Sequence, residues 1–269
     1  MNRIVGYNKS VNDVEFTIKK GETVGLVGES GSGKTTLGRC IVRLYDSTAG
    51  SIKFNVNGKM TELTNLSTKE MKNIRKNFQM LFQDVYSSLD TRMKISKIVT
   101  EPLDIHNVGT KKERIERAKE LMIKVGLSEN DLEKYPHQFS GGQRQRIGIT
   151  RALSINPEFI ICDEPVSALD VSVQAQILNL LGDLKNEFNL SYLFIAHDLS
   201  VVKYISDRII VMYLGKILEI ASSSDIYESP RHPYTEALLA AISKNEAGSK
   251  RDILLKGNIP DPSNPPSGC

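Results

Sequence analysis

The sequence predicts an α/β fold in which short buried strands alternate with helices. Residues 23–27 form a short apolar run that leads into a glycine-rich loop, and residues 37–44 then carry apolar side chains at helical spacing. Two more apolar runs, 159–162 and 192–196, have the length of buried strands and end next to titratable residues. At 269 residues and 40% apolar composition, the chain can bury a sizeable core as one domain or two lobes.

The glycine-rich loop matches the phosphate-binding pattern G-x-x-x-x-G-K-[ST]. Glycines allow a tight turn that aims backbone N–H groups inward, and the following helix adds the positive end of its dipole. Lys34 would reach the β- and γ-phosphates, and the Thr35 hydroxyl would ligate Mg²⁺. A glycine-rich turn with a chance lysine is the alternative, which the complete pattern in this context disfavours. The predicted nucleoside triphosphate site contains Gly28, Ser30, Gly31, Ser32, Gly33, Lys34, Thr35 and Thr36.

The composition argues against several classes of protein. The net charge is +3 and the basic residues are scattered, so no nucleic-acid groove is predicted. Three cysteines, Cys40, Cys162 and Cys269, lack the spacing of a metal or redox motif and favour a reducing compartment. No apolar run is long enough to span a bilayer, and the N-terminus lacks the pattern of a signal peptide. We therefore expect a soluble cytosolic chain that reaches a membrane only through a partner.

Three further segments predict strands. Residues 11–18 alternate as a half-buried strand would, and residues 50–60 predict a hairpin that turns at Asn57-Gly58. Residues 77–83 alternate in the same way and end on Gln83.

The pattern becomes helical from residue 86 to 136, which indicates a lobe inserted between the halves of the sheet. We expect helix breaks within it at Pro102, residues 107–109 and Gly126. Residues 170–188 predict another helix, whose apolar stripe belongs to the core: Ile177, Leu181, Leu184 and Phe188.

Residues 139–143, Phe-Ser-Gly-Gly-Gln, precede another predicted helix. Taken alone, Ser140 is an ordinary helix N-cap, although the unpaired N–H groups of such an end can also bind anions. The string resembles the signature motif of ABC-type ATPases, which other P-loop proteins lack. Four more matches follow the order of that family: Gln83 as the Q-loop glutamine, residues 159–164 as the Walker B strand, residues 167–170 as the D-loop and His197 as the switch histidine.

Other segments narrow the resemblance to the ATP-binding subunits of oligopeptide/dipeptide permeases, and in particular to the second of the two that such permeases carry. The segments are residues 135–146, 166–181, 231–235 and 264–269. Val85 and Asp90 depart from the family pattern, which more often has proline and asparagine there, but neither belongs to the ATP chemistry.

The resemblance implies a P-loop NTPase (RecA-like) core sheet with an N-terminal antiparallel β subdomain and an inserted helical subdomain. We expect an ATPase domain at 1–230, with a core at 1–84 and 156–230 and the helical subdomain at 85–155. A permease-type tail would follow at 231–269.

The resemblance also implies the roles of the site residues. Asp163 would lie at the carboxyl edge of the sheet, where ligands bind, and would hold Mg²⁺ through water, together with Thr35 and Gln83. Glu164 would be the general base or would orient water, and His197 would contact the γ-phosphate. In isolation, Asp163 and Glu164 are as easily solvated charges at a strand end.

The remaining site residues would face the P-loop of a partner subunit, so that each ATP is held between two chains: Ser140, Gly141, Gly142, Gln143 and Asp170. The implied assembly contains a second homologous ATPase subunit, different or identical, two transmembrane permease subunits and an extracytoplasmic substrate-binding protein. Within this assembly, the present chain would be peripheral, at the cytoplasmic face of the membrane. Residues 84–89 are the candidate contact with a permease.

Several alternative functions remain open beside peptide import. The cargo could be nickel or another small solute, since the membrane and binding subunits carry specificity. Repair-type ABC proteins insert a long coiled coil, and ribosome-associated ones carry two cassettes; this sequence has neither. A small-molecule kinase would not need residues 140–143.

Tyr7 and Cys269 are the least constrained predictions. Tyr7 could stack on the ATP base or pack at a sheet edge. Some relatives bind an iron–sulphur cluster beyond this point, but one cysteine cannot replace four thiolates, so we expect no cluster in this sequence.

Overall fold

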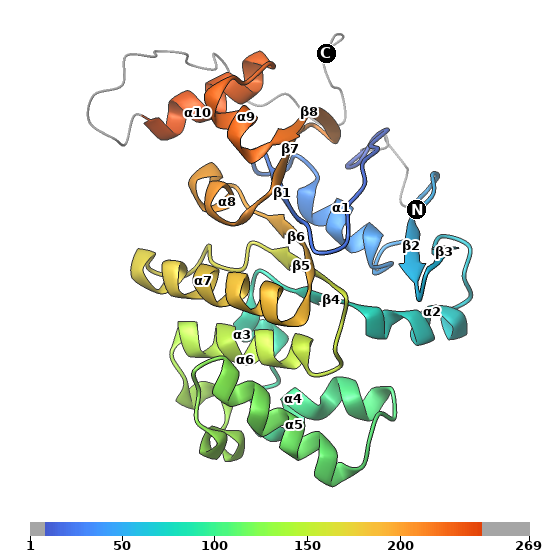
Figure 1. Ribbon diagram of the computed structural model, residues 1–269, viewed down its shortest axis with the longest axis vertical. Coiled ribbons are helices and arrows are strands. Elements are labelled where there is room, and N and C mark those ends of the chain that lie inside the picture. The colour runs from blue at the N-terminus through green and yellow to red at the C-terminus, as the bar shows by residue number, and fades with distance from the viewer. Residues whose placement is uncertain (1–8, 244–269) are drawn as a thin grey trace, which may run out of the picture. The chain divides into compact units, whose positions relative to one another are not determined.

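The computed structural model describes residues 9–243 of the chain (Figure 1). These residues fall into two compact units. Unit 1 contains residues 9–18, 23–38 and 194–243. Unit 2 contains residues 19–22 and 39–193. Tyr7 and Cys269, together with the predictions made for them, lie outside the described residues.

The sheets confirm the predicted α/β class. A six-stranded sheet has the order β4-β5-β6-β1-β7-β8, and a separate two-stranded sheet pairs β2 with β3. β1 pairs with β7 and β4 pairs with β5 in parallel, whereas β8 is antiparallel to β7. Non-sequential neighbours in a parallel sheet require crossover connections, and most of those here contain helices.

Unit 1 is built on β1 and the β7–β8 hairpin. All five residues of β1 are buried, as expected for a strand covered on both faces. Helix α8 approaches β1 so closely that a Cβ on Gly25 would lie 2.1 Å from Val202. The elements of this unit are β1 (Thr23–Val27), the start of α1 (Lys34–Ile41), the end of β6 (Ser191–Ile195), α8 (Leu199–Ile205), β7 (Arg208–Tyr213), β8 (Lys216–Ser222), α9 (Ser223–Glu228) and α10 (Pro233–Ser243).

Unit 2 carries the remaining strands and the helical lobe. The predicted hairpin is present: Asn57 and Gly58 have φ values of 51° and 85°, which Asn and Gly tolerate in such a turn. The unit contains β2 (Lys53–Val56), β3 (Lys59–Glu62), α2 (Thr68–Ile74), β4 (Phe78–Leu81), α3 (Val85–Ser88), α4 (Ile95–Ile105), α5 (Lys111–Lys124), α6 (Gly141–Leu153), β5 (Phe159–Asp163), α7 (Val171–Phe188) and the start of β6. Short 3₁₀ turns occupy Arg75–Asn77, Glu129–Glu133 and Pro136–Gln138.

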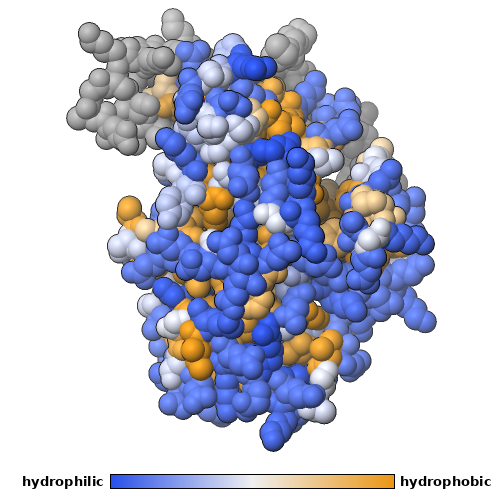
Figure 2. All heavy atoms as spheres, in the orientation of Figure 1, coloured by the Kyte–Doolittle hydropathy of each residue, from blue (hydrophilic) through white to orange (hydrophobic). Residues whose placement is uncertain are grey.

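The helical lobe of unit 2 packs α4, α5 and α6 around a core of fully buried aliphatic side chains, among them Ile95, Val99, Leu121, Met122 and Ile147. Figure 2 shows a mainly hydrophilic surface over α4 and α5 with scattered apolar residues, as expected for helices that bury one stripe. The turn at 107–109 and the positive φ of Gly126 match the expected breaks.

The break expected at Pro102 was wrong, because α4 continues through that residue to Ile105. A proline inside a helix removes one hydrogen bond, but the helix can persist where tertiary packing compensates for the loss. Here Ile98 and Leu103 are buried on either side of the proline.

The strand expected at residues 11–18 was also wrong in part. Burial alternates along these residues as predicted, yet they form no strand in the described structure. Their backbone groups bind other partners: Asn12 N–H donates to Gly215 O, and Thr17 O accepts from Arg208.

Within residues 9–243, no helix combines the length and the apolar composition that crossing a bilayer requires.

Candidate functional site

The P-loop of unit 1 connects β1 to α1, and its glycines have a steric reason. Gly28 has φ 151°, and a Cβ there would lie 2.0 Å from Met212 O at the end of β7. Gly33 has φ 100°, and its Cβ would lie 2.0 Å from Ser10 O. L-residues rarely adopt these φ values, so the loop requires glycine at both positions.

Lys34 begins α1 and is 5% exposed. Its ammonium donates to Gly28 O at 2.7 Å and to Glu29 O at 2.8 Å. The loop therefore curls around the lysine that the sequence assigned to the phosphates. Thr35 and Thr36 follow in the first turn of the helix, where backbone N–H groups are not used within the helix.

Two neighbouring segments support the P-loop. Gly215 N–H, in the β7–β8 turn, donates to Ser32 O at 2.9 Å. Glu29 N–H donates to the hydroxyl of Tyr234, in the first turn of α10, at 3.2 Å. Burial raises the pKa of Tyr234 above its ordinary value, so this hydroxyl stays protonated. The sequence motif at 231–235 contained this residue, but it did not suggest a contact with the P-loop.

His197, also in unit 1, lies two residues beyond β6 and is exposed. Its position directly after the apolar strand segment agrees with the prediction. Its role at the γ-phosphate stays a prediction.

Unit 2 brings Gln83 and Glu164 together. The amide of Gln83, two residues after β4, donates to a carboxylate oxygen of Glu164 at 2.7 Å. Glu164 has φ 47°, a left-handed conformation that costs about 1–3 kcal/mol in a non-glycine residue and is concentrated at functional sites. The hydroxyl of Ser167 donates to Glu164 O at 3.1 Å, which helps to hold this backbone.

Asp163 is the last residue of β5 and is 1% exposed. A buried carboxylate at this position cannot be the solvated charge that the sequence also allowed. Its carboxylate oxygens are the hard donors that Mg²⁺ prefers.

The signature residues begin α6 of unit 2. Ser140 and Gln143 form a capping box, in which Ser140 Oγ accepts from Gln143 N–H and Gln143 Oε1 accepts from Ser140 N–H. Ser140, Gly141 and Gln143 are exposed. The N-cap interpretation is thus confirmed locally, and the helix end remains accessible.

Helix α7 begins beside this helix end. A Cβ on Gly142 would lie 2.5 Å from Val173 Cγ1, so the glycine allows close packing of the two helices. Asp170 caps α7 and accepts from Val173 N–H at 3.0 Å. Hydrogen bonds from the Ser172 hydroxyl and from Val173 N–H lower the pKa of Asp170, which keeps it ionised.

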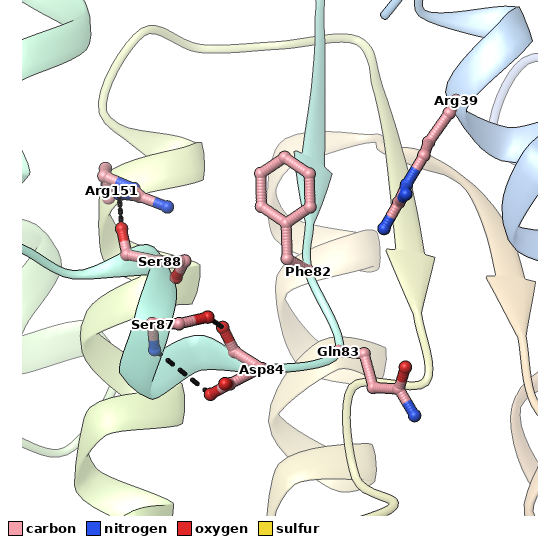
Figure 3. Close-up of a pocket in the computed structure, with 7 residues that line it drawn as sticks. All are labelled: Arg39, Phe82, Gln83, Asp84, Ser87, Ser88 and Arg151. Carbon is pink, nitrogen blue, oxygen red and sulfur yellow. Dashed lines mark hydrogen bonds between the residues drawn. The ribbon is translucent and has the colours of Figure 1, made fainter. Parts of the chain in front are cut away.

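A cavity of about 400 Å³ lies beside the turn that follows Gln83 (Figure 3). Ser88 O accepts from Arg151 at 2.7 Å, and Ser87 N–H donates to Asp84. The sequence singled out residues 84–89 but gave no signal for the two arginines. The lining residues are Arg39, Phe82, Gln83, Asp84, Ser87, Ser88 and Arg151.

The chain also matches known protein families. The profile described as ABC transporter matches residues 11–167, which include the P-loop, Gln83, residues 140–143 and Glu164. The chain belongs to the ABC transporter family. It is therefore an ABC ATPase, an ATP-binding cassette that hydrolyses ATP to drive transport. A second profile, described as the C-terminal region of oligopeptide/dipeptide transporters, matches residues 218–269 of this ABC ATPase.

Individual relatives are similar over nearly the whole chain. The oligopeptide transport ATP-binding protein AppF of Bacillus subtilis is 54% identical over 271 residues, covering 99% of this chain and 81% of AppF. OppF of the same organism is 56% identical, covering 88% of this chain and 77% of OppF. A putative peptide import ATP-binding protein of Brucella ovis is 53% identical, covering 97% and 81%.

The fold is similar to that of a solved ATP-binding cassette. The dimeric cassette MJ0796, in a post-hydrolysis state bound to ADP and Pi, superposes with a TM-score of 0.70 at 31% identity. The match covers 80% of this chain and 90% of that one. The likeness supports the prediction of a P-loop NTPase core for this ABC ATPase.

Proposed function

We propose that this ABC ATPase powers the import of oligopeptides or dipeptides as one of the ATP-binding subunits of a membrane transporter. The observation that carries the proposal is the match of residues 218–269 to the C-terminal region of oligopeptide/dipeptide transporters, beside 53–56% identity to peptide transport ATPases.

Several segments of the chain take part in the proposed ATP chemistry. Lys34 and the loop amides of unit 1 neutralise the phosphates. The donor set predicted for Mg²⁺, from Thr35, Gln83 and Asp163, consists of hydroxyl, amide and carboxylate oxygens and so fits that cation. When bound, Mg²⁺ supplies charge neutralisation at the β- and γ-phosphates.

Glu164 orients a water or accepts its proton as the water oxygen attacks the γ-phosphorus. The bond from the γ-phosphorus to the β–γ bridging oxygen breaks, which leaves ADP and inorganic phosphate. The Gln83 amide holds one Glu164 oxygen at 2.7 Å and aims the carboxylate. His197 contacts the γ-phosphate in this proposal.

Turnover requires two chains. The exposed Ser140, Gly141 and Gln143, with Gly142 and Asp170, face the P-loop of a second homologous ATPase subunit. The relative MJ0796 is described as dimeric, which supports this arrangement. The partner is a different subunit in the full transporter and an identical one in isolation.

The transporter contains two transmembrane permease subunits and an extracytoplasmic substrate-binding protein, with this chain peripheral at the cytoplasmic face. The cavity beside residues 84–89 is our proposed docking place for a permease segment. We keep the division into a core at 1–84 and 156–230, a helical subdomain at 85–155 and a tail at 231–269 as part of this proposal.

The test is co-purification of the tagged chain from its native membranes, with mass spectrometry of the bound proteins. We expect a second ATPase, two membrane subunits and a peptide-binding protein. A nickel-binding or other solute-binding protein in place of the last would change the cargo. Ribosomes or DNA-repair factors would refute transport altogether.

A further inference from the structure

The P-loop residue Glu29 is held through both of its backbone groups. Its carbonyl accepts from the Lys34 ammonium at 2.8 Å, a contact internal to the loop. Its N–H donates to the Tyr234 hydroxyl at 3.2 Å, and that residue lies 205 positions away in α10. A segment beyond the last strand therefore fixes one peptide of the phosphate loop.

Tyr234 is itself firmly placed. It is 7% exposed, and its ring lies against that of Tyr213 at the end of β7, with centroids 4.6 Å apart. Its N–H donates to Nδ1 of His232 at 3.1 Å, which fixes the start of α10. A side chain that is buried, packed against a second ring and held at its backbone loses little further entropy when it accepts a hydrogen bond.

The start of α10 is also tied to the sheet. The carboxylate of Glu219, on β8, accepts from Arg231 N–H at 2.9 Å and from His232 N–H at 3.1 Å. A chain of contacts thus runs from β8 through residues 231–234 to Glu29. All of these residues belong to unit 1.

We propose that Tyr234 is a positioning residue for ATP binding, which acts by fixing the Glu29 peptide and so the curvature of the P-loop. The inference rests on the proposed nucleotide site. It gives residues 218–243, the described part of the region shared with oligopeptide/dipeptide transporters, a role in the ATP site.

Packing alone is the competing explanation, because a buried tyrosine hydroxyl usually finds some hydrogen-bond partner. On that explanation, removing the hydroxyl would alter stability without a particular effect on nucleotide. The two explanations differ in ATP affinity, which is therefore the quantity to measure.

The test is Tyr234→Phe, which keeps the ring against Tyr213 and removes the acceptor of the Glu29 N–H. We expect the ATP Kd by calorimetry and the KM for ATP to rise about three- to tenfold, the effect of one lost hydrogen bond. Since Tyr234 would not touch the reacting atoms, kcat should stay within about twofold of the wild type.

A matched control is Tyr227→Phe in the same unit. The Tyr227 hydroxyl donates to the backbone oxygen of Leu199, so this variant also removes a partly buried tyrosine hydrogen bond to the backbone, but not one to the P-loop. We expect its ATP affinity to equal that of the wild type. Glu219→Gln, which weakens the anchor of α10 without altering Tyr234, should raise the Kd in the same direction by a smaller factor.

The outcomes separate this inference from the nucleotide site itself. Wild-type affinity in Tyr234→Phe, with ATP binding lost in Lys34→Ala, would overturn the inference and leave the site intact. Equal weakening in Tyr234→Phe and Tyr227→Phe would show general loosening and also overturn it. Retained binding in Lys34→Ala would instead refute the nucleotide site.

Discussion

The P-loop and the signature segment are both glycine-containing turns at a helix N-terminus, yet the structure treats them differently. In the P-loop, Gly28 and Gly33 have positive φ, and neighbouring backbone oxygens leave no room for a Cβ. In the signature, neither Gly141 nor Gly142 has positive φ, and a Cβ on Gly141 would meet only ordinary contact, 3.4 Å from Leu169. The first pair is required by the fold of the chain, and Gly141 is not.

The polar groups differ in the same way. Lys34 and Glu29 of the P-loop bind other groups of unit 1. Ser140 and Gln143 cap each other at an exposed helix end. An accessible helix N-terminus with a glycine that the fold does not require leaves room for an anion to approach its backbone N–H groups, as the nucleotide of a second subunit would in our proposal. This difference is consistent with our proposal that one chain binds the nucleotide and that two chains are needed for turnover.

Glu164→Gln tests the separation of binding from turnover and carries the largest expected effect. Loss of the base should lower kcat by about 10²–10⁴-fold, while ATP binding is retained. Steady-state phosphate release and calorimetry measure the two quantities. Glu187→Gln, an exposed carboxylate on α7, is the control and should hydrolyse at the wild-type rate. Unchanged hydrolysis by Glu164→Gln would remove the base assignment.

Lys34→Ala tests the P-loop side. The variant removes the ammonium that we assign to the β- and γ-phosphates, so ATP affinity should fall by about 100-fold or more. Calorimetry measures the affinity, and circular dichroism checks that the variant folds. An unchanged Kd in a folded variant would contradict the lysine's role.

Gly28→Ala and Gly31→Ala separate steric need from backbone preference within the P-loop. A Cβ at Gly28 would collide with Met212 O, whereas at Gly31 no atom of the described residues, apart from those of Gly31 and its two chain neighbours, lies within 4 Å of the Cβ position. We expect Gly28→Ala to lower the free energy of unfolding by about 2–4 kcal/mol and Gly31→Ala by about 1 kcal/mol. Urea unfolding measures both, and equal losses would contradict the steric argument.

Gly141→Ala should have the smallest effect on stability, and it should change stability and turnover in opposite directions. Alanine is favoured over glycine in a helix, so the free energy of unfolding should rise by about 0.5–1 kcal/mol. Turnover should nevertheless fall if a partner's phosphates approach this helix end closely. Higher stability with unchanged ATPase activity would contradict the contrast between the two segments, because Gly141 would then have no role in turnover with a partner subunit.

Much of the candidate site could be predicted because it is local. The P-loop pattern, the strand ends at Asp163 and His197, and the cap at Ser140 each follow from a few consecutive residues. Pro102 shows the limit of local rules, because packing on both sides carries α4 through it. Residues 11–18 show another limit: their alternation was correct, but a strand also needs a partner, which only the fold supplies.

The sequence by itself determined the fold class and the family, and it predicted the phosphate-binding and Walker B residues, because spacing within a short segment dictates that chemistry. Only the tertiary structure decided that Gln83 contacts Glu164 and that Tyr234 contacts Glu29. Each pair joins residues far apart in the chain, and a hydrogen bond between them depends on how the strands and helices pack, which no local pattern encodes.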